Sequence, residues 1–369
     1  MTGAVIRRCP ILRESHTRRC STRSRRIHAP NGRFRLTTWP VACALASFVG
    51  GCDPITSPQP PAAQPAALVN TVDASAWLPP SPDPAGIVHV EHLGHLAVSD
   101  SEVNEIPSLF TGANLFETML DGTLLRTFDT LDLTEEPTGL AYDPSNLHLF
   151  VATDNSAKRV FEIDPGADAL YGTADDSVTS FSTLDFGSND AEGLTFNPQD
   201  GTLLVVDGVN SEVYTVDPGF DGRFNGMPPA GDDTVSSFDT TTIGITDPEG
   251  IAYDSDFGHL YIVGKPATRV AHVSLAGTLL RTIDISAAGA SKPAGLAYAP
   301  SSVDPSARSN LFIVDRGVDN DTDPNENDGR IFEFSLPDFE EEASLSMVTD
   351  GPMDEVASVG RGTGDMDVM

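Results

Sequence analysis

Five short stretches of the sequence share a glycine at a fixed position, and in four of them an acidic side chain stands three residues before it; these acids are the residues best suited to bind a metal ion. They are DPAGIVHV from Asp83, EPTGLAYD from Glu136, DAEGLTFN from Asp190, DPEGIAYD from Asp247 and KPAGLAYA from Lys292. Two stretches carry a second acid directly before the glycine, Glu192 and Glu249. Carboxylate oxygens are the ligands that hard cations such as Ca²⁺ prefer. The chemistry therefore depends on whether the fold brings these acids together.

The glycines of the five stretches mark a repeat. Gly86, Gly139, Gly193, Gly250 and Gly295 lie 45 to 57 residues apart, a spacing typical of repeat architectures. Three more apolar runs follow the motif in the same order, such as HLFVATD, RVFEIDP and VTSFSTL after the second motif, and turn dipeptides separate them. No amphipathic helix stands out. Four antiparallel strands repeated five times predict an all-β protein, a β-propeller of five four-stranded blades, with six blades as the alternative if an irregular segment hides one.

The last repeat shows only three strands before the composition changes after Pro337. Closing the ring then requires a strand from elsewhere in the chain. We predict that ALVNTVDASAW, residues 67–77, supplies the outer strand of the last blade. The propeller domain is otherwise expected to span residues 86–338.

This architecture predicts where the acids meet. In a propeller blade the first strand lines the central channel and the second returns beside it, so the start of strand one and the end of strand two share one channel mouth. The acids expected to bind a metal ion at this mouth are Glu192, Glu249, Asp190, Asp247, Asp207 and Asp154. Asp83, Glu136, Asp100 and Asp315 should lie at the same mouth. Crowded carboxylates raise one another's pKa, and a bound Ca²⁺ would balance their charge. The alternative is that these acids cap turns and face water.

Three acidic loops offer further calcium ligands. Residues 164–176 and 217–233 align with each other, which pairs Asp168 with Asp221 and Asp175 and Asp176 with Asp232 and Asp233. A third loop, 318–329, carries Asp319, Asp321 and Asp323 followed by Asn325, but Pro324 stands where an EF-hand loop needs glycine. We expect calcium in at least one of these loops, whereas the alternative is that they are solvated acidic loops.

The histidines and lysines of the sequence are weaker candidates for a functional site than the acids. His89, His92 and His95 of HVEHLGH span a strand, a turn and the next strand, so their rings should point in different directions and not form a zinc site. Lys265 and Lys292 fall on the acidic mouth and are expected to neutralise neighbouring acids. The sequence contains no GxSxG, P-loop or Rossmann glycine motif.

Repeated DPEG-strand units with VVD-type second strands and VYxVD-type third strands resemble the NHL and SdiA-regulated bacterial propellers, and more distantly the phytase-like esterase and SMP-30/gluconolactonase propellers. The resemblance covers residues 86–337. It implies a propeller fold, and the SMP-30 likeness implies a metal-binding role for Glu192 or Glu249. The chain lacks the EGP motif and the asparagine ligands of that family. Two functions follow: a calcium-binding recognition module, or a calcium-dependent hydrolase of the lactonase or phytase-like esterase type.

The N-terminal residues read as a targeting segment. Residues 1–51 hold ten arginines and one acid, Glu14, and end in the short apolar stretch VACALASFVGG. Such a stretch is too short to span a bilayer and predicts a signal peptide. The sequence VGGC resembles a lipobox, which predicts lipidation of Cys52 and an exported protein anchored at the bacterial cell envelope, or otherwise secreted. Cys52 would be the only cysteine of the mature chain, so no disulfide can form within it.

Composition also indicates the nature of the remaining segments and the kind of partner that the protein can bind. Residues 52–85 are rich in proline and predict an extended linker, and residues 339–369 predict a disordered acidic tail. The net charge of -32 disfavours nucleic acid and anionic lipid, so any contact with a membrane should be made only through the lipid anchor. A small molecule or a cationic ligand fits better, bound to a monomer.

Overall fold

The computed structural model describes residues 62–104, 107–318 and 327–339, which all belong to the compact unit Gln59–Met369. Several predictions lie outside the described residues: the signal peptide 1–51, Cys52, the loop acids Asp319, Asp321 and Asp323, and the tail beyond Phe339. No helix in the described ranges is long and apolar enough to cross a membrane.

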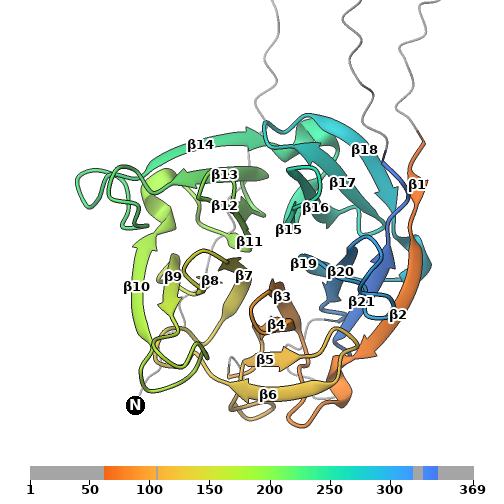
Figure 1. Ribbon diagram of the computed structural model, residues 1–369, viewed down its shortest axis with the longest axis horizontal. Coiled ribbons are helices and arrows are strands. Elements are labelled where there is room, and N and C mark those ends of the chain that lie inside the picture. The colour runs from red at the N-terminus through yellow and green to blue at the C-terminus, as the bar shows by residue number, and fades with distance from the viewer. Residues whose placement is uncertain (1–61, 105–106, 319–326, 340–369) are drawn as a thin grey trace, which may run out of the picture. The chain divides into compact units, whose positions relative to one another are not determined.

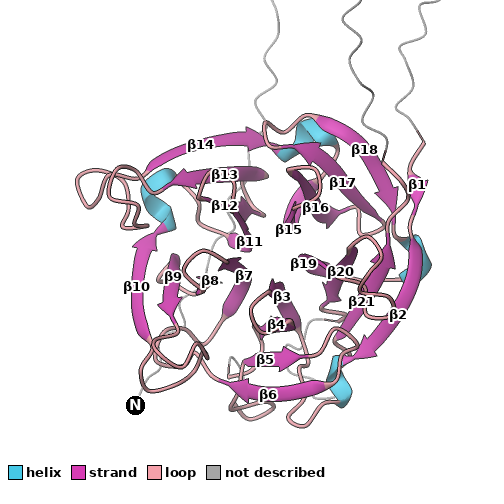
Figure 2. Ribbon diagram, in the orientation of Figure 1, coloured by secondary structure: helices cyan, strands magenta, loops and turns pink. Residues whose placement is uncertain are grey.

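The described residues form a five-bladed β-propeller (Figures 1 and 2). The blades are numbered in chain order. Blade 1 contains β3 (Pro84–Val90), β4 (His95–Asp100), β5 (Leu115–Thr118) and β6 (Leu124–Phe128), and blade 2 contains β7 (Pro137–Asp143), β8 (His148–Thr153), β9 (Arg159–Asp164) and β10 (Ser177–Ser182). Blade 3 contains β11 (Ala191–Asn197), β12 (Thr202–Asp207), β13 (Glu212–Asp217) and β14 (Thr234–Asp239), blade 4 contains β15 (Thr246–Asp254), β16 (His259–Lys265), β17 (Arg269–Ser274) and β18 (Leu279–Asp284), and blade 5 contains β19 (Pro293–Ala299), β20 (Asn310–Asp315) and β21 (Arg330–Ser335). The prediction of five four-stranded blades is confirmed. The six-blade alternative is wrong.

Short 3₁₀ helices accompany the strands. They are η1 (Ala74–Ala76), η2 (Thr183–Phe186), η3 (Thr240–Ile243) and η4 (Ser286–Ala288). The last three follow the outer strands of blades 2, 3 and 4 and lead the chain back to the axis, and each ends at a glycine with positive φ.

The ring closes as predicted, with a strand from the start of the fold. β2 (Ala67–Asp73) pairs antiparallel with β21 and forms the outer strand of blade 5. Residues 74–76 form η1 and not strand, and Trp77 then donates its Nε1–H to the carbonyl of Gly122 at 3.2 Å.

The folded unit starts well before residue 86. β1 (Gln64–Pro65) pairs in parallel with β18 at the outer edge of blade 4, where a proline costs no ladder hydrogen bond. The described part of the Pro-rich segment 52–85 therefore belongs to the propeller and does not act as a linker, because its strand residues complete two blades.

The five motif glycines are required by the contact between neighbouring first strands. A Cβ atom on Gly86 would lie 2.2 Å from the carbonyl oxygen of Thr138, and one on Gly250 would lie 2.1 Å from that of Ala294. None of the five has a positive φ, so a turn conformation does not explain why glycine stands here. Glycine is needed at these positions because the backbones of neighbouring first strands approach each other closely around the axis. The glycines and the apolar residues after them fill the axis at this level, where the cavity volume is about 0 Å³.

The core lies between blades. Side chains alternate along a strand, so each blade packs one face on the preceding blade and one on the next. In β7, Leu140 and Tyr142 pack with Ala97 of blade 1, whereas Ala141 packs with Leu194 of blade 3. This packing makes the five first strands a rigid frame for the residues at the channel mouth.

Candidate functional site: an acidic channel mouth

The starts of the first strands and the ends of the second strands lie at the same mouth of the channel. The strand register pairs Pro84 with Asp100, Ala191 with Asp207 and Pro293 with Asp315. The predicted acids therefore do gather at one end of the propeller. They fall into two groups with different surroundings.

The first group caps turns. Asp207 is fully buried and accepts hydrogen bonds from the backbone N–H groups of Asn189 at 3.0 Å, Asp190 at 3.3 Å and Asn210 at 2.6 Å. Asp100 and Asp315 accept equivalent bonds in blades 1 and 5. Burial, followed by the charge of Asp83, raises the pKa of Asp100 to about 6. These aspartates fix the turn that leads into the first strand.

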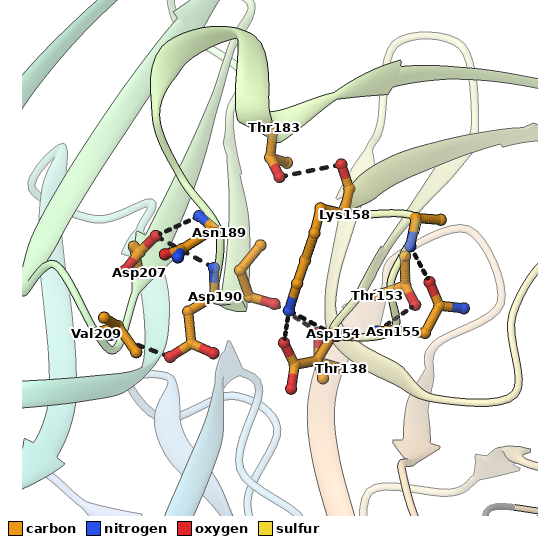
Figure 3. Close-up of polar contacts among 12 residues, drawn as sticks. Thr138, Thr153, Asp154, Asn155, Lys158, Thr183, Asn189, Asp190, Asp207 and Val209 are labelled. Carbon is orange, nitrogen blue, oxygen red and sulfur yellow. Dashed lines mark hydrogen bonds and ion pairs between the residues drawn. The ribbon is translucent and has the colours of Figure 1, made fainter.

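The second group projects into the mouth. Asp154 of blade 2 and Asp190 and Glu192 of blade 3 each offer a carboxylate oxygen, and these oxygens lie within 4.8 Å of one another. No other group of three or more acid, histidine or cysteine side chains in the described part of the chain is so close. Figure 3 shows Asp154 and Asp190 facing the same space, while Asp207 turns back to the amides of Asn189 and Asp190.

A cavity of about 190 Å³ adjoins this acidic trio, which we define as Asp154, Asp190 and Glu192. It is lined by Ser101, Glu102, Glu136, Thr138, Asp154, Glu192 and Arg316. Beyond the first-strand starts, the close-packed motif glycines leave a cavity volume of about 0 Å³ along the axis. The cavity beside the acidic trio is large enough for an ion with several waters or for a small ligand group.

Two glutamates of this mouth have raised pKa values. Burial raises the pKa of Glu192 well above its usual value, and the neighbouring Glu249 raises it further. Burial is also the main cause of the raised pKa of Glu249, and Arg316 opposes the shift in both. The fold therefore opposes full ionisation of this pair.

Basic side chains partly balance the mouth, and the charge of Lys292 opposes the raised pKa of Glu249. Arg316 donates its Nε–H to Asp83 Oδ1 at 2.7 Å. Burial lowers the pKa of Arg316, but Asp83 and then Glu192 and Glu249 outweigh it and raise the pKa above its usual value. Lys158 forms an ion pair with Asp154, and Lys265 forms one with Asp247. The neutralising role predicted for Lys265 is thus observed.

Lys265 does not occupy the position that the capping aspartates hold in other blades. Gly264, not Lys265, stands opposite Pro248, where other blades have the capping aspartate. Lys265 is the last residue of β16 and lies one position beyond Gly264, as Arg316 lies one position beyond Asp315 in blade 5. Arg316 and Lys158 were missed altogether. The signal for Arg316 was the sequence NLFIVDR, in which a basic residue follows a VVD-type strand.

Asp190 and Asp247 crowd around a glycine of blade 3. Asp190 Oδ2 accepts a hydrogen bond from the backbone N–H of Val209 at 3.0 Å. A Cβ atom on Gly208 would lie 2.9 Å from Asp190 Oδ2 and 3.1 Å from Asp247 Oδ1. Asp247 itself has a φ of 51°, a left-handed conformation that non-glycine residues rarely adopt. The small residue at position 208 leaves room for the carboxylates beside it.

The acids of the two aligned hairpin loops bind their own backbones. Asp175 accepts from the N–H of Ala167 at 2.8 Å, and Asp232 accepts from that of Phe220 at 2.9 Å. The remaining predicted acids of these loops, Asp168, Asp176, Asp221 and Asp233, accept similar local hydrogen bonds. Calcium binding in these loops stays a prediction.

The three histidines of HVEHLGH have separate environments. His92 contacts Tyr142 and the carbonyl of Ala169, whereas His95 lies 4.0 Å from Glu117. Burial lowers the pKa of His89 to about 4, and this ring lines a cavity at the other mouth of the channel. They belong to no cluster of three metal-ligating groups in the described ranges.

A scan of protein-family models finds no match to the chain, and a search of curated proteins finds none. Among solved structures, the chain is similar to a luciferin-regenerating enzyme with a TM-score of 0.41 and 14% identity, over 69% of this chain and 78% of that one. It is also similar to a chain of a nidogen/laminin complex, with a TM-score of 0.40 and 16% identity over 64% of this chain and 73% of that one. A third similar structure is streptogramin B lyase, with a TM-score of 0.38 and 16% identity over 73% of this chain and 88% of that one. Likenesses this distant carry no argument about activity, and membership of the NHL or SdiA-regulated families stays a prediction.

Proposed function

We propose that this propeller is an exported calcium-binding recognition module whose ion lies at the acidic channel mouth. The observation that carries the proposal is the acidic trio, three carboxylates from two neighbouring blades with oxygens within 4.8 Å of one another. A hard cation compensates such a cluster better than side-chain amines do, because it accepts six to eight oxygen ligands at once. The ligand recognised beside the ion is a small molecule or a cationic group, bound by a monomer.

The donor set fits calcium. Lys158 takes one oxygen of Asp154, and the N–H of Val209 takes one oxygen of Asp190, which leaves the other oxygens of both residues and the Glu192 carboxylate for an ion. Ca²⁺ tolerates irregular geometry and completes its shell with water, whereas Mg²⁺ requires a strict octahedron. Because Lys158 and Arg316 already offset part of the charge, the site should be weak and suited to the millimolar calcium outside cells.

Calorimetric titration of the chelator-treated full chain tests this proposal. We expect one calcium ion to bind to the wild type, and binding to fall at least about tenfold in the variant Asp190→Asn, Glu192→Gln, which keeps the shape of both side chains. Glu91→Gln, at an exposed glutamate that follows β3 at the other mouth of the channel, is the matched control. Equal binding by the double variant and the control would refute the assignment of the ion to the mouth.

Export completes the proposal. It rests on the arginine-rich segment 1–51, the lipobox-like VGGC and the lipidation of Cys52. Labelling of cells with a clickable fatty acid should mark the wild-type protein and not Cys52→Ser. Equal labelling of both proteins, or none, would exclude a lipid anchor at this cysteine.

A second candidate function is a calcium-dependent hydrolase, and the Glu192–Glu249 pair favours it. Carboxylates with raised pKa values beside a cation site take up a proton more readily than ordinary carboxylates, as general base catalysis requires. Bound calcium would polarise a carbonyl or phosphoryl oxygen in the cavity, and Arg316 would attract an anionic substrate. Turnover of lactones or phosphate esters that is lost in Glu249→Gln would support this function over simple recognition. Absence of turnover with a calcium-loaded protein would exclude those substrates.

A further inference from the structure

A second site of different chemistry emerges from the comparison of blades 1 and 2. In every blade, a central residue of the third strand pairs with a residue of the fourth strand at an equivalent position. These pairs are Glu117 with Arg126, Glu162 with Thr179, Thr215 with Ser236, His272 with Arg281 and Glu333 with Asn70, from blade 1 to blade 5. Blades 1 and 2 thus share a glutamate at the same position. They differ in what stands opposite it.

Blade 1 shows how this position binds a guanidinium group. Arg126 donates its Nε–H to Glu117 Oε2 at 2.7 Å and its Nη2–H to Oε1 at 2.5 Å, a bidentate pair with a glutamate that is only 2% exposed. Its Nη1–H binds the carbonyl oxygen of Tyr171 at 2.8 Å. Tyr171 belongs to the β9–β10 hairpin loop of blade 2, which folds over blade 1.

Blade 2 has the same frame without the arginine. Thr179 replaces Arg126 and donates its hydroxyl hydrogen to Glu162 Oε2 at 3.2 Å, while His148 Nδ1 lies 2.6 Å from Oε1. The β13–β14 hairpin loop of blade 3 covers this position as the β9–β10 loop covers blade 1. Both loops begin with Asp-Pro-Gly, and Phe224 is the counterpart of Tyr171. Figure 1 shows the two loops projecting from the outer side of their blades.

A cavity of about 370 Å³ fills the space beside Glu162. Its lining includes His148, Glu162, Asp164, Thr179 and Phe224, so it has an acidic wall and an aromatic cover. The side chain of Glu162 is 13% exposed. Arg223 also lines the cavity, but it is exposed, and no ion pair links it to Glu162 or Asp164 in the described structure. In blade 2 no arginine forks onto this carboxylate; its oxygens contact Thr179 and His148, and a guanidinium would displace these two contacts.

We propose that this cavity between blades 2 and 3 binds a small alkylguanidinium ligand. Its planar fork would lie on Glu162 as Arg126 lies on Glu117, and a third N–H would reach the carbonyl of Phe224, the counterpart of Tyr171. Asp164 adds a second negative charge near the opening, and Phe224 offers an apolar face for the alkyl chain. A guanidinium fits better than an ammonium because only the planar fork makes two parallel bonds to one carboxylate. This site is independent of the calcium site at the channel mouth.

Calorimetric titration with butylguanidinium, and with butylurea as its uncharged counterpart, tests the proposal on the full chain. We expect one butylguanidinium to bind the wild type and butylurea not to bind. Thr179→Arg places an arginine where blade 1 has Arg126 and should abolish binding while raising the melting temperature. Glu162→Gln should weaken binding roughly 10- to 100-fold, the loss of hydrogen bonds to a charged group.

Ser236→Arg is the matched control, because it makes the same kind of change at the same register of blade 3, opposite Thr215 and not a glutamate. It should leave binding intact. The proposal is overturned if the wild type does not bind butylguanidinium, if butylurea binds equally well, or if Ser236→Arg abolishes binding as Thr179→Arg does. Binding seen only in Arg223→Ala would also overturn it, since Arg223 would then be the occupant. Should Thr179→Arg not fold, Glu162→Gln decides the test.

Discussion

Arg316 Nε lies 2.7 Å from Asp83 Oδ1, and this ion pair joins the last blade of the ring to the first. Arg316 follows the second strand of blade 5, and Asp83 precedes the first strand of blade 1. Asp83 is fully buried. The pair therefore combines two roles: it links blades 5 and 1 next to the β2 closure, and it holds a positive charge beside Glu192 and Glu249.

Replacing Arg316 by Met should destabilise the protein by about 3–5 kcal/mol, because it removes one partner of a buried ion pair. Urea denaturation followed by fluorescence measures the change. Arg269→Met, at an exposed arginine, should stay within about 0.5 kcal/mol of the wild type. If both variants unfolded at the same urea concentration, the ion pair would have no part in ring closure.

Gly250→Ala should destabilise the ring, because its Cβ would meet the carbonyl oxygen of Ala294 at 2.1 Å. We expect a cost of about 3 kcal/mol, at the upper end of overpacking effects, since a backbone atom cannot turn away. Gly289→Asn is the control: this glycine has a φ of 65° and open space around it, and asparagine tolerates that conformation. Thermal unfolding should separate the two variants, and a Gly250→Ala protein as stable as Gly289→Asn would contradict the close-packed axis.

Glu192→Gln should stabilise the protein when calcium is removed. A glutamate whose pKa is raised in the folded state destabilises that state above its unfolded pKa, near 4.5, because folding opposes its ionisation. The gain should therefore be absent near pH 4, appear as the pH rises and be present at pH 8. Chemical denaturation in chelator at both pH values measures it, with Glu91→Gln as the control. A loss of stability at pH 8 would mean that the folded protein favours the charged form of Glu192.

The repeat architecture could be predicted from the sequence because strands and turns are encoded locally. The missing fourth strand of the last repeat was enough to assign Ala67–Asp73 to ring closure. The glycine motif was recognised, but its reason was not, because the atoms that exclude a side chain at Gly250 belong to a strand more than 40 residues away.

Whether an acid caps a turn or projects into the mouth depends on a shift of one residue along the strand. Asp207 stands opposite Ala191 and turns back to cap the chain, whereas Asp154 lies one position beyond Thr153 and projects into the mouth. Both follow a second strand in the sequence, so the pattern alone could not separate a capping acid from a candidate ligand. The Arg316–Asp83 pair was hidden for a related reason: its partners are 233 positions apart and meet only when the ring closes.

The melting temperature of the full chain in chelator and in millimolar calcium tests the proposed function most directly. A site filled at 100 times its dissociation constant adds about 2.7 kcal/mol of stability. We expect calcium to raise the melting temperature of the wild type and of Glu91→Gln, and to leave that of Asp190→Asn, Glu192→Gln unchanged. A calcium shift that survives in the double variant would move the ion away from the mouth, and no shift in the wild type would contradict calcium binding altogether.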